Sequence, residues 1–168
     1  MNKDIQEAFE GTRVAGLVAA SALDEVAKII KPGVTTNDID NLCYEFINDN
    51  YAYSAPLFYR GFPKSCCTSP NHTICHGIPG EKTLTDGDII NVDVTSFKNG
   101  WHGDTSRMFY VGEVSVKAKK LIDVTYNSMM KAIKILNKQI TLGDIGSTIQ
   151  TYVEKEGFSV VRDFCGHG

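Results

Sequence analysis

Long apolar runs are absent from this sequence, as are a signal-type leader and an excess of basic residues. The longest mostly apolar stretch, residues 14–23, lies between Arg13 and Asp24 and is far shorter than the roughly 20 residues of a membrane-spanning helix. Residues 1–4 show neither an apolar core nor an Arg-rich amphipathic pattern. The 17 basic and 20 acidic side chains give a net charge of −3. We therefore expect no membrane association and no nucleic-acid recognition.

Cysteine is sparse and shows no metal-binding spacing. The 5 cysteines, an odd number, are Cys43, Cys66, Cys67, Cys75 and Cys165. Because disulfides persist mainly in oxidising compartments, this usage predicts reduced thiols in a cytoplasmic protein. With 42% hydrophobic and 22% charged residues over 168 positions, the composition is that of one ordinary globular domain.

The periodicity of apolar residues predicts an α/β protein. Helical spacing occurs over residues 4–30, 35–50, 116–138 and 141–157. Extended segments are predicted over residues 64–69, 73–76, 88–97, 101–110 and 158–164. A weak repeat at an offset of 106 residues relates Val34–Ile47 to Ile140–Val153. It predicts a duplicated unit within a single domain 1–168, complete over about residues 4–112 and incomplete over about residues 115–168.

Residues 88–110 predict a β-hairpin that carries two aspartates. Asn99-Gly100 favours a two-residue type I′ turn, in which both central residues have positive φ. Asp104 then faces Thr95, and Asp93 lies two residues away on the same face. Their Cβ atoms would be about 7–8 Å apart, a separation at which two carboxylates can hold a pair of metal ions. A three-residue loop would instead place Asp104 on the opposite face.

Two solvated acids on an ordinary hairpin are the alternative to a metal site. Against that alternative, Asp93 is embedded among the apolar residues of Ile89–Val94. An unpaired carboxylate buried there would be very costly, and a bound divalent cation would remove the cost. The same register places His102 on the face of the two aspartates, which makes it a candidate ligand as well.

Five motifs occur here in one order: Cys75-His-Gly-Ile-Pro79, Asp88-Ile-Ile-Asn-Val-Asp-Val-Thr95, His102-Gly-Asp-Thr-Ser106, Phe158-Ser-Val-Val-Arg162 and Gly166-His-Gly168. In this combination the whole chain closely resembles the type I methionine aminopeptidases of the pita-bread metallopeptidase family. The resemblance implies a curved antiparallel sheet backed by helices, with a pseudo-twofold repeat whose second half is incomplete here. It also implies a cytoplasmic metal-dependent hydrolase that removes the initiator methionine from nascent proteins.

The resemblance assigns roles to the metal ligands. Asp93 matches the carboxylate of the first metal, Asp104 the carboxylate that bridges both metals, and His167 the imidazole ligand of the second. Such a site would take two divalent ions, of which Mn, Fe and Co suit it and Zn is compatible. His102 matches no ligand position in that family, so the resemblance favours a supporting role for it.

The resemblance also implies a substrate site. His76 matches the histidine that contacts the scissile amide, and Tyr59, Phe62 and Cys67 match the wall of the methionine pocket. Taken without the motif, His76 is better explained as a loop or strand-end histidine bonded to backbone, and core positions are the alternative for Cys67 and Tyr59. The implied partners are nascent polypeptides with an N-terminal methionine, and the ribosome is a candidate partner.

The chain departs from the family at its C-terminus. The family completes its site with two glutamates and a further histidine beyond the Gly-His-Gly motif, where this sequence stops. We therefore expect a chain that lacks its C-terminal part and is inactive by itself. A proline-specific aminopeptidase and a non-catalytic pita-bread binding protein are the alternative functions. The short connection from Asp104 to Val116 favours a methionine aminopeptidase over the former, and the filled ligand positions argue against the latter.

Overall fold

The computed structural model describes residues 3–137 and 139–166, which form two compact units. The first unit comprises residues 1–114 and the second residues 115–168. Among the described residues, no helix is long and apolar enough to cross a bilayer. The predicted internal duplication and the single domain stay predictions, because the described part of the second unit carries no sheet to compare with that of the first.

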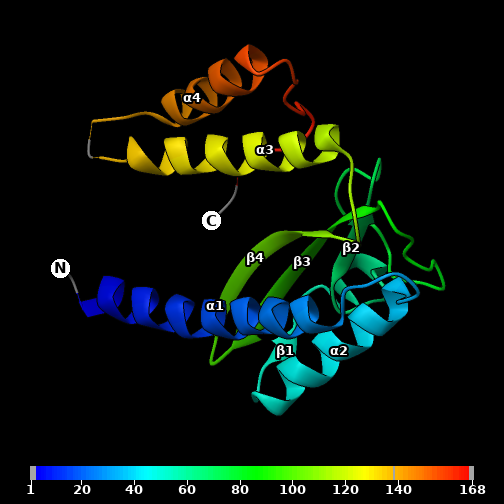
Figure 1. The fold of residues 1–168 in the computed structure, drawn as a ribbon. Coiled ribbons are helices and arrows are strands. Elements are labelled where there is room, and N and C mark those ends of the chain that lie inside the picture. The colour runs from blue at the N-terminus through cyan, green and yellow to red at the C-terminus, as the bar shows by residue number, and fades with distance from the viewer. Residues whose placement is uncertain (1–2, 138, 167–168) are drawn as a thin grey trace. The chain divides into compact units, whose positions relative to one another are not determined.

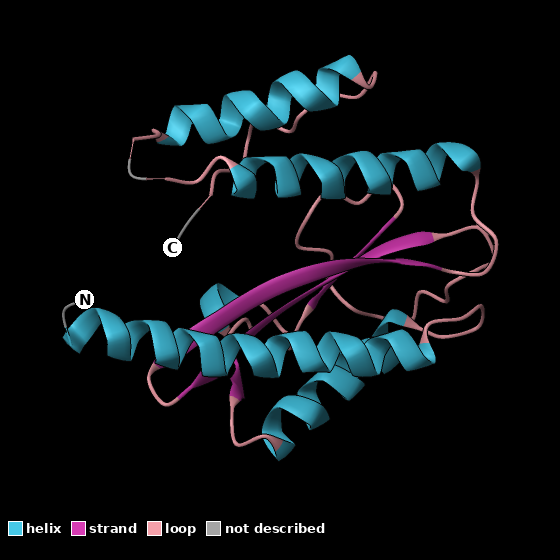
Figure 2. Ribbon diagram, turned by 60° about the vertical axis from the view of Figure 1, so that its left-hand side comes forward, coloured by secondary structure: helices cyan, strands magenta, loops and turns pink. Residues whose placement is uncertain are grey.

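The first unit is a curved antiparallel sheet backed by two helices (Figures 1 and 2). The helices are α1 (Lys3–Ile29) and α2 (Thr36–Asp49), and the strands are β1 (Tyr53–Ser54), β2 (Cys67–Pro70), β3 (Ile89–Lys98) and β4 (Trp101–Tyr110). Strand β3 is central, since it pairs with β4 along its whole length and with β1 and β2 as well. A 3₁₀ turn, η1 (Tyr59–Gly61), precedes β2. The predicted mixed fold with an antiparallel sheet and covering helices is confirmed.

Capping boxes start α2 and one helix of the second unit. The Thr35 side chain accepts from the amide of Asp38, whose carboxylate accepts in return from the amide and hydroxyl of Thr35. Thr141 and Asp144 repeat this arrangement at the start of α4 (Leu142–Lys155). These hydrogen bonds hold the pKa of Asp38 and Asp144 below the usual value for an aspartate. The sequence Thr35-Thr-Asn-Asp38 by itself predicts a capping-box start for α2, and that prediction is confirmed.

The core lies between the helices and one face of the sheet. It contains buried apolar side chains of α1, α2 and β3, chiefly Ala19, Ala22, Leu23, Val26, Ile39, Cys43, Ile47, Ile90, Val92 and Val94. Helix α1 approaches the sheet closely because Gly103 of β4 has no side chain, and a Cβ there would lie 2.1 Å from the backbone nitrogen of Gly16. The Ser96 hydroxyl donates to the Ala15 carbonyl at 2.7 Å and fixes the same contact.

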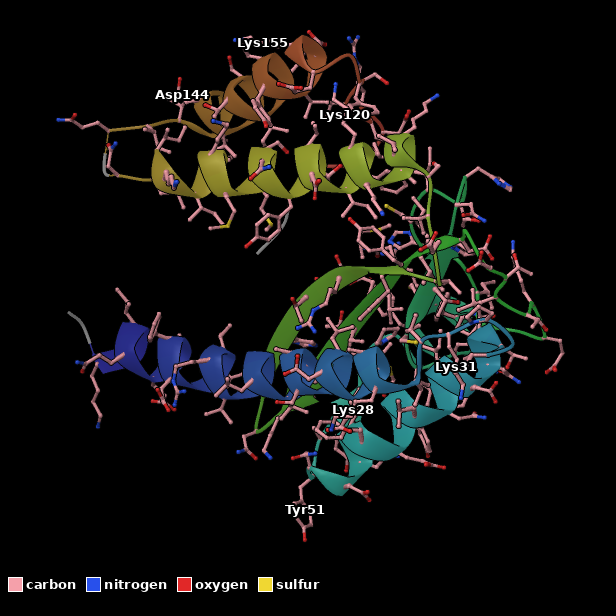
Figure 3. The ribbon with its side chains drawn as sticks, in the orientation of Figure 1. Lys28, Lys31, Tyr51, Lys120, Asp144 and Lys155 are labelled. Atoms are coloured by element: carbon pink, nitrogen blue, oxygen red, sulfur yellow. The ribbon has the colours of Figure 1, made fainter. Side chains whose placement is uncertain are left out.

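The second unit is a pair of helices, α3 (Val116–Lys134) and α4. Lys120 of α3 donates to the carbonyl of Glu156 at 2.9 Å, at the end of α4 that carries Lys155 (Figure 3). Lys131 lies over the ring of Tyr152, with its ammonium 4.7 Å from the centroid.

The helical spacing over residues 116–138 predicts that α3 turns six side chains inward: Leu121, Ile122, Met129, Ala132, Ile133 and Leu136. This prediction is largely wrong. Leu121, Met129, Ile133 and Leu136 are 38–55% exposed, whereas Val124, Ser128 and Ala132 are buried. Ala132 alone of the residues predicted to be inward is buried in this unit. The reason is that α4 covers only one stripe of side chains on α3, and the sequence pattern does not indicate which apolar stripe α4 buries.

Two predicted strands are also wrong. Residues 73–76 form an irregular loop, and residues 158–164 have no strand structure. A strand exists only through hydrogen bonds to a neighbouring strand, and the described part of the second unit supplies none. Apolar composition alone therefore overstated the extended segments.

Candidate metal centre

The β3–β4 hairpin has the predicted register. Lys98 pairs with Trp101, and the ladder continues without a bulge to Ile89 and Tyr110. Asn99 has φ 53° and Gly100 has φ 86°, as a two-residue type I′ turn requires. The even loop therefore holds Asp93 and Asp104 on one face of the sheet.

Asp93 and Asp104 lie on the face of the sheet opposite the core. Asp104 pairs with Thr95, whose hydroxyl donates to Asp104 Oδ1 at 2.9 Å. Asp93 is half-buried and Asp104 is exposed. The expectation that Asp93 is buried among its apolar neighbours is wrong, because side chains alternate along a strand and the neighbours at 90, 92 and 94 enter the core instead. Both carboxylates are accessible to an ion.

Cys67 is the neighbour of Asp93 on the other side of β3. The two residues are directly paired across β2 and β3, and Cys67 is 8% exposed. Burial raises the pKa of the Cys67 thiol to about 11, and the negative charges of Asp93 and Asp104 act in the same direction. Cys67 is therefore a neutral thiol beside the carboxylates, suited to forming a wall and not to binding metal as a thiolate.

His76 belongs to a strained loop that is tied to β2. Cys75 and His76 are exposed and have φ of 56° and 50°, in the left-handed region that costs about 1–3 kcal/mol at a non-glycine residue. The next residue, Gly77, accepts from the amide of Thr68 at 2.8 Å and donates to the hydroxyl of Ser69 at 3.2 Å. A Cβ at Gly77 would lie 2.1 Å from the Thr68 carbonyl oxygen, so only glycine fits there. These contacts fix the loop one residue from His76.

Tyr59 and Phe62 lie in the irregular segment that leads into β2. Tyr59 is 64% exposed in the 3₁₀ turn, and the Arg60 guanidinium lies 5.5 Å from its ring centroid. Phe62 is half-buried, and its carbonyl accepts from the amide of Phe58 at 2.8 Å. The segment therefore presents one exposed and one half-buried aromatic side chain, eight and five residues before Cys67.

His102 has a partner of its own on the aspartate face. It pairs with Phe97 across the hairpin, and the two ring centroids are 4.8 Å apart. This packing supplies a structural reason for the histidine that needs no metal. His167 lies outside the described residues. Among residues 3–137 and 139–166, no group of three or more His, Cys, Asp or Glu side chains is arranged to hold a metal ion. The described part of the centre is thus the Asp93–Asp104 carboxylate pair.

A curved antiparallel sheet backed by helices, with two carboxylates on its other face, is the architecture of the pita-bread class of proteins. Residues 10–168 match the profile of metallopeptidase family M24, and the chain belongs to that family.

Relatives and solved structures agree with this assignment. The chain is 55% identical over 160 residues to the methionine aminopeptidase of Rickettsia prowazekii and 48% identical over 164 residues to that of Escherichia coli, covering 95% and 96% of this chain. It spans only 62% of the length of either relative. The crystal structure of the Rickettsia prowazekii methionine aminopeptidase superposes with a TM-score of 0.95 at 54% identity, covering 97% of this chain and 66% of that one.

A more distant likeness concerns the fold alone. The Xaa-Pro dipeptidase from Bacillus anthracis superposes with a TM-score of 0.78 over 90% of this chain and 41% of that one, at 18% identity. The fold is thus shared with an enzyme whose sequence has diverged far from this one.

Proposed function

We propose that this chain forms the N-terminal part of a methionine aminopeptidase that removes the initiator methionine from nascent proteins. The observation that carries the proposal is the hairpin register, which holds Asp93 and Asp104 on one face with Cys67 directly beside Asp93. The names of the similar Rickettsia and Escherichia proteins support the same activity. Those relatives also favour it over a proline-specific aminopeptidase, since the Xaa-Pro enzymes share the fold at far lower identity.

The donor set fits a pair of divalent cations. Two carboxylates on one face of the sheet, from β3 and β4, offer hard oxygen ligands, and the Thr95 hydroxyl orients one of them. We assign Asp93 to one ion, Asp104 to a bridge between the two, and His167 to the second ion. Oxygen ligands with one imidazole suit Mn²⁺, Fe²⁺ or Co²⁺, and Zn²⁺ is compatible. When bound, such ions supply Lewis acidity that activates water at neutral pH.

The remaining roles belong to this chain's own side chains. His76 donates or accepts a hydrogen bond at the scissile amide, from a loop that Gly77 holds against β2. Tyr59, Phe62 and the neutral thiol of Cys67 form the apolar wall that receives the methionine side chain. The thioether of methionine packs favourably against apolar, polarisable groups, and two aromatic rings and a thiol provide them.

This function places the protein in the cytoplasm, where nascent chains leave the ribosome. Its partners are then nascent polypeptides with an N-terminal methionine, and the ribosome is the candidate docking partner. The absence of a basic surplus in the composition argues that it does not bind nucleic acid by itself.

Peptide hydrolysis by the protein expressed from its complete open reading frame tests the proposal. After chelation and reloading with Mn²⁺, the protein should release methionine from Met-Ala-Ser and leave Ala-Pro peptides intact. The metal-free protein is the control. Cleavage of Ala-Pro in preference to Met-Ala-Ser, or metal-independent cleavage, would overturn the assignment.

A further inference from the structure

Asp40 is a buried carboxylate outside the candidate metal centre. It lies on α2, is 6% exposed, and its Oδ1 accepts from the amide of Ser65 at 2.8 Å, from the hydroxyl of Ser65 at 2.6 Å and from the amide of Cys66 at 3.1 Å. Its other oxygen lies 3.6 Å from the ammonium of Lys64. One side chain thus satisfies three donors of a segment 25 residues away.

The held segment joins the two parts of the proposed methionine pocket. Phe62 lies just before it, and Cys67 follows it directly as the first residue of β2. Ser65 and Cys66 are themselves buried, at 2% and 0% exposure. Because Cys67 pairs with Asp93, any movement of this segment shifts the pocket wall relative to the carboxylates.

The buried carboxylate of Asp40 fixes the backbone conformation of the segment that it contacts. A carboxylate removed from water is costly unless hydrogen bonds compensate it, and hydrogen bonds to a charged acceptor are shorter and stronger than neutral ones. Here the compensating donors are backbone and side-chain groups of the segment that carries the pocket. The carboxylate therefore restrains the backbone at 65–66 directly.

We infer that Asp40 is a positioning residue for the methionine pocket: by fixing the backbone of Ser65 and Cys66 from α2, it sets the place of Cys67 beside Asp93. This inference rests on the proposed function, because the pocket is assigned there. Asp40 acts on the pocket through the segment that it holds and not by contact with the substrate.

Cysteine labelling of residues 1–168 tests the structural half of the inference. Asp40→Ala leaves two buried amides without an acceptor, so Cys67 should react with iodoacetamide about tenfold faster than in the wild type, as expected for local opening. Asp40→Asn retains an oxygen at the Oδ1 position and is the matched control, with labelling close to the wild-type rate. Cys75, which is exposed, supplies the reference rate, and buried Cys43 reports global unfolding.

The labelling outcomes are distinct. An unchanged Cys67 rate in Asp40→Ala, with Cys43 protected, overturns the inference. If Cys43 becomes reactive together with Cys67, Ser65→Ala decides, because it removes a single donor and keeps the carboxylate. In Ser65→Ala, Cys67 should be labelled faster than in the wild type while Cys43 stays protected. If both cysteines of this variant are as protected as in the wild type, the inference is overturned.

Kinetics of the protein from the complete open reading frame test the functional half. Asp40→Ala should raise KM for Met-Ala-Ser about tenfold while kcat stays within about twofold, because a loosened pocket weakens binding without touching the reacting groups. The KM of Asp40→Asn should stay close to the wild-type value. A lower melting temperature with an unchanged KM would show that Asp40 only stabilises the fold. No hydrolysis by any variant would refute the proposed function and leave the labelling result standing.

Discussion

Replacing Gly103 by alanine tests how tightly α1 is packed on the strand that carries Asp104. An alanine Cβ at this position would lie 2.1 Å from the backbone nitrogen of Gly16 and 2.2 Å from the carbonyl carbon of Ala15. Ordinary contacts between heavy atoms are about 3.5–4.0 Å, so the helix must move away by more than 1 Å. These are backbone atoms of a helix, which cannot turn aside as a flexible side chain could.

The expected destabilisation follows from that overlap. Adding a methyl group to a well-packed core typically costs about 1–3 kcal/mol, and a rigid backbone neighbour places Gly103→Ala at the upper end. The displaced helix would also weaken the hydrogen bond from Ser96 to the Ala15 carbonyl, which now measures 2.7 Å. A loss of about 3 kcal/mol corresponds to a fall in melting temperature of about 6–12 °C for a chain of this size.

Thermal unfolding followed by circular dichroism measures the effect, with Gly16→Ala as the matched control. Gly16 lies on the other side of the same contact, but a Cβ there would meet nothing within 4 Å. Because alanine is the better helix former, Gly16→Ala should stabilise the protein by about 0.5–1 kcal/mol. A melting temperature of Gly103→Ala within about 2 °C of the wild type would refute the packing argument, since the cost would then be below about 1 kcal/mol.

Four further predictions concern the candidate metal centre. In the protein from the complete open reading frame, Asp104→Asn should lower activity by several orders of magnitude at saturating Mn²⁺, and activity within about tenfold of the wild type would contradict the bridging role proposed for Asp104. His76→Ala should keep the metal content, measured by atomic emission, and lower kcat about 10²–10³-fold; a loss of metal would make it a ligand. His102→Ala should keep both ions and His167→Ala should lose one, whereas the reverse result would favour the hairpin geometry over the family resemblance. Residues 1–168 alone should show no turnover and at most one weakly bound Mn²⁺ by calorimetry, because the three proposed ligands cannot fill the coordination of two ions. Tight binding of two ions with turnover would refute this expectation.

Local patterns in the sequence determined the hairpin and the helix starts. The Asn99-Gly100 turn sets the register, and a side-chain period of two then places Asp93 and Asp104 on one face. The capping box at Thr35 sets the start of α2 in the same local way. These features depend on interactions between residues close in the chain, so the sequence alone was sufficient to predict them. The family assignment also needed only the order of the motifs, and the match over residues 10–168 confirms it.

Only the tertiary structure decided which residues surround the aspartates and which segments become strands. Two contacts join positions about 25 residues apart: the strand pairing of Cys67 with Asp93 and the hydrogen bonds from Ser65 to Asp40. No periodicity in the sequence encodes such contacts. The positive φ of His76 accompanies the hydrogen bonds that join its loop to β2. Residues 158–164 form no strand because the described residues of their unit offer no partner strand. In each case the conformation is set by a neighbour distant in sequence, because burial and strand pairing are properties of the folded chain as a whole.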